Sequence, residues 1–307
     1  MKEDLIIKND QMQWIDILNP TADEMKEIGL KHNIPHHIIE DSLDSKHLPK
    51  YEKRDEYHFV ILRAYDEKAL HEADTVQELT RKLVILYNDN FLFTIHRVEQ
   101  SFLQGIKKNF QNKKSDKNEI SNILFDLLYS ISFSYKIPIE KSLDQLEDLE
   151  MGVFGLQGSH KFKIKEGYYL KRKAFVFKRI LRLTSDILSL IPHQNRLKLQ
   201  PLKELLESCY FYADTLTESV NSLLHLHISL STQKTGEASH RTNEVMRVLT
   251  IFSVFLLPLN LVTGIYGMNF KYMPELNMSL GYPMALMIMF CISLVTYLWF
   301  RKKGWLK

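Results

Sequence analysis

The clearest pattern along the chain is a pair of long apolar runs near the C-terminus. No charged residue occurs from Val248 to Phe270 or from Leu276 to Phe300, which are runs of 23 and 25 residues. As helices that rise about 1.5 Å per residue, both would cover a hydrocarbon layer roughly 30 Å thick. The pattern predicts two transmembrane helices, at 248–270 and 276–300. Two buried helices of a soluble protein are the disfavoured alternative, because such helices seldom exceed about 20 residues without a charge.

Basic residues flank both runs on the sides away from the connecting loop. Arg241 and Arg247 precede the first run, and the basic tail 301–307 follows the second. Because cytoplasmic flanks carry the excess of Lys and Arg, both termini are expected in the cytoplasm, with the chain in the plasma or inner membrane. The connecting loop, with its core at 271–275, is expected to lie outside.

Residues 1–115 carry the mixed pattern of a cytoplasmic α/β domain. Segments rich in β-branched and aromatic residues at 13–18, 56–65 and 83–96 predict strands, and Asn88 to Asn90 supplies a hairpin turn. We therefore expect a mixed or antiparallel sheet.

Helix start signals follow the first predicted strand. Thr21 with Glu24 three residues later has the capping-box spacing, and Pro35 fits the first turn of a second helix. Two helices are therefore expected before the next strand.

From about residue 116 the apolar spacing becomes that of helices. It predicts helical arms at 116–200 and a stalk helix at 201–247 that continues into the first transmembrane helix. A helix from about 202 to 266 would be close to 100 Å long. Such a helix needs partner helices to bury its apolar stripe.

Two segments of the arms carry opposite charge. Residues 140–150 are acidic and residues 161–182 are basic. We interpret them as solvated faces of neighbouring antiparallel helices, with a role in the electric field near a pore mouth as the alternative.

The composition narrows the function classes. Forty Lys and Arg against 37 Asp and Glu give a net charge of +3, which does not suggest a nucleic-acid partner. Cys209 and Cys291 have no metal-ligand or redox spacing and are interpreted as structural thiols. The N-terminus has neither a signal-peptide nor a transit-peptide pattern.

Enzyme chemistry finds no support in the motifs. The pairs His36-His37 and His225-x-His227 lack further converging ligands, and residues two apart on a helix point in different directions. The glycines at 152, 155 and 158 fit neither a P-loop nor a dinucleotide fingerprint. We expect no enzyme and no organic cofactor.

A polar stripe marks the first predicted transmembrane helix. Two helices cannot enclose a hydrophilic path, so conduction would need a homo-oligomer with one such helix per subunit around the axis. Helix packing in lipid is the alternative explanation of the stripe. Its members recur at intervals of three and four: Met246, Leu249, Ser253, Leu257, Asn260 and Gly264.

The end of that helix has the chemistry of a cation mouth. The last carbonyls and the helix dipole are negative there, Gly264 and Gly267 permit close approach of backbones, and Asn269 adds a neutral oxygen. A ring of such oxygens could hold hydrated Mg²⁺ through its water molecules without trapping it. A hydrated divalent cation is therefore chemically compatible with this helix end.

At this point the chain resembles the CorA family of magnesium transport proteins. The motif YGMN at 266–269 follows the first run, MPEL at 273–276 follows it, and a second run with a basic tail completes the order. The segments WIDILNP, HHIIEDSL and FVILRAY are also similar to the family's N-terminal domain, so the resemblance covers most of the chain.

The resemblance implies a membrane α-helical channel with a cytoplasmic α/β domain, a stalk helix that continues into the first of two transmembrane helices, and a homopentameric funnel. It implies passive, potential-driven Mg²⁺ influx, with Co²⁺ also passing and Mg²⁺ as both transported and regulatory ion. The apolar members of the stripe would form a hydrophobic gate. The resemblance also implies an outer selectivity filter at Gly267, Met268 and Asn269. Pore-facing positions of the family match Asn243, Met246, Leu249, Leu257, Asn260 and Gly264.

Family members also sense cytoplasmic Mg²⁺ between subunits. The resemblance places one acidic ligand at Asp41 and a second on the stalk, where Glu204, Glu207 and Asp214 all remain candidates. Bound Mg²⁺ would bridge the carboxylates, and its loss would leave like charges that loosen the ring.

The chain departs from the family pattern in its charges and in one pore position. Lys271 stands just after GMNF, where many relatives are acidic, and Glu275 is the loop's other charge. Asn260 stands where threonine is common, and the stalk near His225 is acidic in some relatives. Lys271 lowers the negative potential of the outer mouth, the amide of Asn260 still supplies an oxygen, and an inner acidic ring near His225 is not assumed.

Two other functions stay as alternatives. One is a transporter of Zn²⁺ or another divalent cation from the related branch, against which Met268 argues. The other is a membrane-anchored Mg²⁺ sensor that does not conduct.

Overall fold

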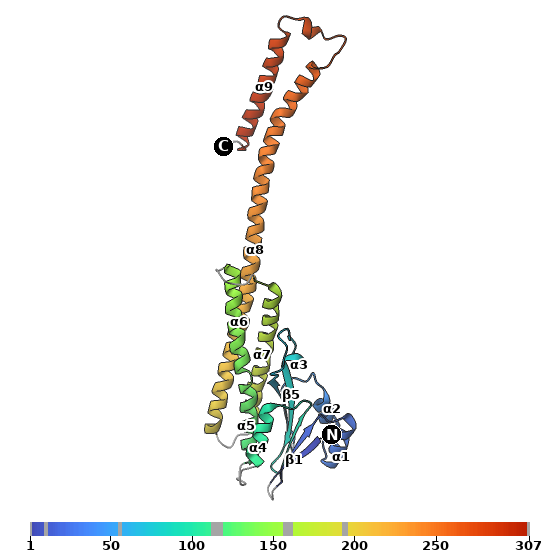
Figure 1. Ribbon diagram of the computed structural model, residues 1–307, viewed down its shortest axis with the longest axis vertical. Helices are drawn as coiled ribbons and strands as arrows, with labels where there is room; N and C mark the ends of the chain where they lie inside the picture. The colour runs from blue at the N-terminus through green and yellow to red at the C-terminus, as the bar shows by residue number, and fades with distance from the viewer. Residues whose placement is uncertain are drawn as a thin grey trace. The chain divides into compact units, whose positions relative to one another are not determined.

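The computed structural model describes residues 2–8, 12–54, 57–111, 119–155, 162–191 and 196–305. The chain divides into two compact units, Met1–His227 and Ile228–Lys307, which are described separately (Figure 1). Gly158 and Lys307, which the sequence analysis considered, lie outside the described residues.

The first unit is built on a six-stranded sheet in the order β1-β2-β6-β5-β4-β3. Strands β2 and β6 are parallel, and the other neighbouring pairs are antiparallel. The sheet is therefore mixed, and the predicted hairpin joins β5 to β6. The strands are β1 (Lys2–Lys8), β2 (Gln13–Leu18), β3 (Lys50–Lys53), β4 (His58–Tyr65), β5 (Thr80–Tyr87) and β6 (Phe91–His96).

Both faces of the sheet are covered, as the alternation along β4 shows. Phe59 and Ile61 pack with helices α1 (Ala22–Lys31) and α2 (His36–Leu43), whereas Val60 and Leu62 pack into the core on the opposite face. Successive side chains of a strand point to opposite faces, so β4 contributes to both cores. Figure 1 shows α1 and α2 on one side of the sheet and α4 on the other.

The predicted capping box of the first helix is confirmed, whereas the predicted place of Pro35 within the second helix is wrong. Thr21 caps α1, with its hydroxyl accepting from the backbone N–H of Glu24 and its own N–H donating to the Glu24 carboxylate. Pro35 is the residue before α2 and not part of its first turn. A proline at that place costs nothing, because the first N–H groups of a helix have no intrahelical partner.

Helices follow the sheet along the chain. A one-turn helix, α3 (Val76–Leu79), lies between β4 and β5. The longer helices are α4 (Ser101–Gln111), α5 (Glu119–Phe133), α6 (Lys136–Phe154) and α7 (Ile164–Leu190).

Helices α6 and α7 are neighbours, as their opposite charges suggested, but their charged side chains pair elsewhere. Among the described residues, Arg172 pairs with Asp74 at 2.9 Å and Lys178 pairs with Asp214. The contact between the two helices is apolar, through Leu146 and Leu149 of α6 with residues of α7.

Helix α8 (Arg196–Tyr266) passes without interruption from the first unit into the second. Within the first unit, its buried side chains recur at alternating intervals of four and three, which is the spacing of a helix seam. They pack on the sheet-side core and on α6 and α7. These residues are Leu202, Leu206, Cys209, Ala213, Leu216, Val220 and Leu223.

The second unit is a pair of helices joined by a short connection. Helix α9 (Gly281–Lys302) returns beside the last part of α8, and the Phe255 and Phe300 rings stack at 5.9 Å (Figure 1). Between them lies a 3₁₀ helix, η1 (Pro274–Asn277). The second charge-free run therefore begins in η1, several residues before α9 starts. Both long helices are apolar and long enough to cross a membrane.

Candidate pore and regulatory metal sites

The predicted pore stripe lies on one continuous helix. Because α8 is helical throughout 243–264, residues at intervals of three and four share one face. All seven residues are exposed in the single chain. The stripe therefore has no partner within the described part of this copy. Its members are Asn243, Met246, Leu249, Ser253, Leu257, Asn260 and Gly264.

The candidate filter begins where α8 ends. Helix α8 stops at Tyr266, and the N–H groups of Gly267 and Met268 donate to the carbonyls of Thr263 and Ile265 at 2.9 and 3.2 Å. Asn269 comes immediately after this capped end and is exposed, and its amide makes no hydrogen bond within the described residues. The geometry leaves the Asn269 side chain available to an ion or to another copy.

The connection after the filter is held by a close backbone approach. The N–H of Gly281 donates to the carbonyl of Met278 at 3.0 Å, and a Cβ at Gly281 would lie 2.0 Å from the carbonyl oxygen of Glu275. Only glycine fits there. Lys271 and Glu275 are both exposed, and among the described residues neither forms an ion pair.

Asp41, the predicted regulatory ligand, lies near the end of α2, and nitrogen atoms of two side chains already contact its carboxylate. Its Oδ1 is 2.8 Å from Nε2 of His47, and its Oδ2 is 2.9 Å from Nζ of Lys50. The same ammonium lies 3.2 Å from Glu52. Burial opposes ionisation of Asp41, but the hydrogen bond from Lys50 and the charge of His47 outweigh it and hold the pKa of the carboxyl below its usual range.

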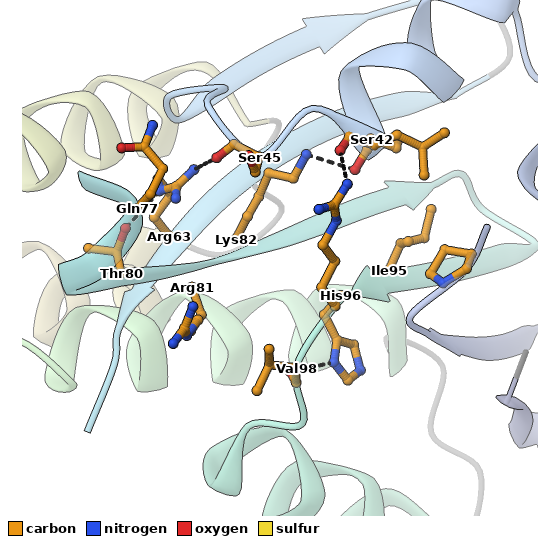
Figure 2. Close-up of a pocket in the computed structure, with 13 residues that line it drawn as sticks. Ser42, Ser45, Arg63, Gln77, Thr80, Arg81, Lys82, Ile95, His96 and Val98 are labelled. Atoms are coloured by element: carbon orange, nitrogen blue, oxygen red, sulfur yellow. Dashed lines mark hydrogen bonds between the residues drawn. The ribbon is translucent and has the colours of Figure 1, made fainter. Parts of the chain in front are cut away.

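Three cationic side chains fix the backbone next to Asp41. Arg63 and Lys82 face each other across β4 and β5, and Arg97 follows the end of β6, on the face that α2 covers. Figure 2 shows Arg63 and Lys82 reaching toward the segment after α2. Like charges in such positions repel one another unless they find acceptors.

The acceptors are backbone carbonyls of residues 41–47. Lys82 donates to the carbonyls of Asp41 and Ser42 at 2.8 and 2.7 Å and also to that of Asp44. Arg63 donates to the carbonyls of Ser45 and His47 at 3.0 and 2.7 Å. The bonds to Asp41 and Ser42 satisfy two of the last carbonyls of α2, which have no intrahelical partners. The others hold the segment after α2, so together they fix the backbone around Asp41.

Arg63, Lys82 and Arg97 line a small cavity of about 190 Å³. Burial, together with the charge of Arg63, lowers the pKa of Lys82 to about 8. Lys82 is therefore still mainly protonated at neutral pH, as its three carbonyl acceptors require. The cavity is smaller than the roughly 300 Å³ at which ordinary ligand pockets begin.

The stalk carboxylates do not converge on Asp41 within one chain. Glu204 accepts from Gln200 at 2.8 Å, Glu207 lies 3.7 Å from Lys203, and Asp214 pairs with Lys178. Within the described residues, no group of three or more His, Cys, Asp and Glu side chains could hold a metal ion. A single hard carboxylate with water molecules suits Mg²⁺ as part of a site, so Asp41 fits such an ion only if further oxygens come from elsewhere.

Within the part of the chain that the structure describes, the histidine pairs do not gather into a metal-binding group either. The His227 ring packs on Phe162 with centroids 4.3 Å apart, and His36 and His37 lie near different carboxylates, Glu40 and Glu52. Free Cys209 is buried and free Cys291 is exposed, in keeping with their interpretation as thiols.

Sequence reasoning missed the cations around Asp41. Lys50 and Lys82 lie on strands, and their proximity to Asp41 depends on strand register and on the path of residues 44–49. No local motif encodes that proximity. The one available signal was a charged residue, Arg63, on the face of β4 where the preceding members, Phe59 and Ile61, are apolar.

Comparisons with known proteins match the chain to one family of transport proteins. The family model of the CorA-like Mg²⁺ transporter proteins matches residues 9–302. The cobalt/magnesium transport protein CorA of Thermotoga maritima is 29% identical, with 95% of this chain and 83% of that protein covered. Its counterpart in Methanocaldococcus jannaschii is 25% identical, with 99% and 94% covered.

Solved structures show the same fold. The complete CorA magnesium transporter of Methanocaldococcus jannaschii matches with a TM-score of 0.58 at 22% identity, over 98% of this chain and 93% of that one. The full-length CmaX protein matches with a TM-score of 0.60 at 15% identity, over 96% and 90%.

The fold and its two membrane-length helices define an α-helical membrane transport protein with an α/β domain. Within that class, the chain belongs to the CorA-like Mg²⁺ transporter family, because the family model matches nearly its whole length.

Proposed function

We propose that the chain forms a homopentameric channel for passive Mg²⁺ influx, which also passes Co²⁺, in the plasma or inner membrane with both termini in the cytoplasm. The observation that carries the proposal is the capped end of α8 at Tyr266, where Gly267, Met268 and an exposed Asn269 follow at once. The family membership and the name of the Thermotoga relative support the choice of ions.

The driving force is the membrane potential. A divalent ion that crosses 100 mV gains about 4.6 kcal/mol, from roughly 2.3 kcal/mol per charge. No ATP is needed, because this energy sustains a gradient of more than a thousandfold.

Each part of α8 has a role in this proposal. The Asn269 amides of the copies form an outer ring that holds hydrated Mg²⁺ through water, with Gly267 and Met268 completing the filter. The apolar positions Met246, Leu249 and Leu257 form a gate that closes by excluding water. Asn243, Ser253, Asn260 and Gly264 complete the pore face.

Regulation uses Asp41 in this proposal. A Mg²⁺ ion bound between Asp41 of one copy and a stalk carboxylate of the next, at Glu204, Glu207 or Asp214, holds the ring closed. Loss of the ion leaves two carboxylates that repel each other, so the ring loosens as cytoplasmic Mg²⁺ falls.

The test is Mg²⁺ entry into liposomes that contain the purified full-length protein and an internal Mg²⁺ indicator. We expect entry with the unmodified chain and a loss of at least tenfold with Asn269→Ala. Asn277→Ala, which changes a second asparagine of the same connection, is the matched control and should conduct normally. Silence of the unmodified chain at low internal Mg²⁺ would favour a sensor that does not conduct, and normal entry with Asn269→Ala would remove the filter role.

A further inference from the structure

Both oxygens of the Asp41 carboxylate are engaged by side chains of its own chain. His47 lies 2.8 Å from one oxygen and Lys50 lies 2.9 Å from the other. A divalent ion that approaches Asp41 therefore meets a carboxylate whose two oxygens both already have a donor.

Lys50 is held in place by more than this contact. It is the first residue of β3 and pairs with Ile61 of β4. This pairing fixes its backbone and places its side chain on the sheet face that α2 covers. Its ammonium also lies 3.2 Å from Glu52, whose carboxylate in turn contacts Arg54. The hydrogen bond with Asp41 raises the pKa of Lys50, so the ammonium stays charged at neutral pH.

Glu52 gives the ammonium a second position. Because Lys50 already touches both carboxylates, it can leave Asp41 by a small side-chain rotation and keep its contact with Glu52. Displacement from Asp41 then does not leave a charged group without a partner. The side chain of Lys50 is 38% exposed, which permits such a movement.

We propose that Lys50 is a built-in competitor of the regulatory ion, occupying Asp41 when Mg²⁺ is scarce and moving to Glu52 when Mg²⁺ binds. The inference rests on the proposed regulatory role of Asp41. Lys50 thereby sets the Mg²⁺ concentration at which the sensor fills, because each bound ion must displace or repel one resident positive charge. Lys50 therefore acts on the ion through Asp41 and is not itself a ligand of the ion.

The experiment measures protection of the full-length protein from protease as a function of Mg²⁺ concentration. Removing the charge in Lys50→Gln should lower the half-protecting concentration about tenfold, the order expected when a unit charge within roughly 4 to 5 Å of a divalent ion is removed. Lys50→Arg should raise it above that of the unmodified chain, because a guanidinium pairs more firmly with a carboxylate. Lys53→Gln, at an exposed position on the same strand, is the matched control and should change nothing.

Asp41→Asn separates the two levels of the argument. If Asp41→Asn abolishes protection while the Lys50 variants titrate like the unmodified chain, the competition is wrong and the regulatory role stands. If Asp41→Asn is protected normally, the regulatory role fails and the competition fails with it. If Lys50→Gln does not fold, the shift of Lys50→Arg decides alone, and no shift overturns the inference.

Discussion

The two units of the molecule differ in how far their own chain covers their apolar side chains. In the first unit, the apolar seam of α8 from Leu202 to Leu223 is covered by helices of the same chain, and the buried side chains of Asp16 and His96 contact each other. In the second unit, the apolar side chains of the same helix, such as Leu249 and Leu257, are 60% and 66% exposed. One helix therefore serves two environments.

The difference shows what each unit needs in order to be stable. The first unit buries its own core and needs no partner to explain its burial pattern. The second exposes far more apolar surface than a soluble protein tolerates, so an apolar environment such as lipid must cover it. Substitutions at the buried seam of α8 in the first unit should act on folding, and substitutions at the exposed stripe of α8 in the second should act on transport.

The buried charges of the first unit give the largest expected effect. Asp16 accepts from His96 at 3.1 Å and from Lys107 and Thr94. Asp16→Asn should destabilise the unit by about 3 to 5 kcal/mol, because it leaves the part-buried Lys107 ammonium without its counter-charge. Denaturant unfolding of the full-length protein, followed by the fluorescence of buried Trp14, measures the loss. A loss below about 1 kcal/mol would show that the charges are not paired in solution.

The same carboxylate predicts a pH dependence. Burial alone would raise the pKa of Asp16, but hydrogen bonds from His96, Lys107 and Thr94 outweigh it and lower the pKa below 3.8. Its stabilising effect is complete above about pH 4 and is lost as the pH falls through the folded-state pKa. The stability difference between the unmodified chain and Asp16→Asn should therefore narrow below pH 4, and a difference that widens would contradict the pairing.

A matched pair of leucines on α8 tests the comparison directly. Leu216 is fully buried, so Leu216→Ala should cost about 2 to 5 kcal/mol of unfolding free energy. Leu257→Ala should cost less than about 1 kcal/mol in the same unfolding measurement and should instead change Mg²⁺ entry through the proposed gate. Equal losses of stability at the two positions would break the comparison.

A matched pair of glycines gives a smaller effect in the second unit. Gly281→Ala places a Cβ against the Glu275 carbonyl, so the connection must shift at a cost of about 1 to 3 kcal/mol. A Cβ at Gly264 meets nothing within 4 Å in the single chain. Gly264→Ala should leave the protease resistance of dispersed single chains unchanged and reduce the transport of the assembled protein. If Gly264→Ala prevented folding, the close contact at Gly264 would lie within one chain and not between copies.

Lys271 gives the smallest expected effect. Lys271→Glu should raise Mg²⁺ entry about two- to threefold at low external Mg²⁺ and low salt, because it makes the outer mouth more negative. High salt should remove the gain by screening. Lys303→Glu reverses a charge near the opposite end of α9 and is the control. A gain that persists at 1 M salt would argue against an electrostatic cause.

Local signals predicted much of the fold. The capping box at Thr21, the hairpin at Asn88 and the continuous helix into the first membrane span follow from short-range spacing, and the structure confirms them. The start of α9 at Gly281 was placed too early because absence of charge does not separate a 3₁₀ turn from a helix.

The candidate sites were predictable only in part. The motif at Tyr266 to Asn269 is contiguous, so sequence alone located it at a helix end. The neighbours of Asp41 come from three separate strands and a loop, and the pairing of Lys50 and Lys82 with this segment requires the sheet register. Sites assembled from distant segments have no local pattern to reveal them.

The most direct test of the central claim is Mg²⁺ entry into ATP-free liposomes as a function of an imposed membrane potential. The account predicts that entry through the unmodified chain rises as the interior becomes more negative, since about 2.3 kcal/mol per charge is gained for each 100 mV. Entry that is absent at an interior potential of about −100 mV, or that does not depend on potential, would contradict passive conduction by this protein.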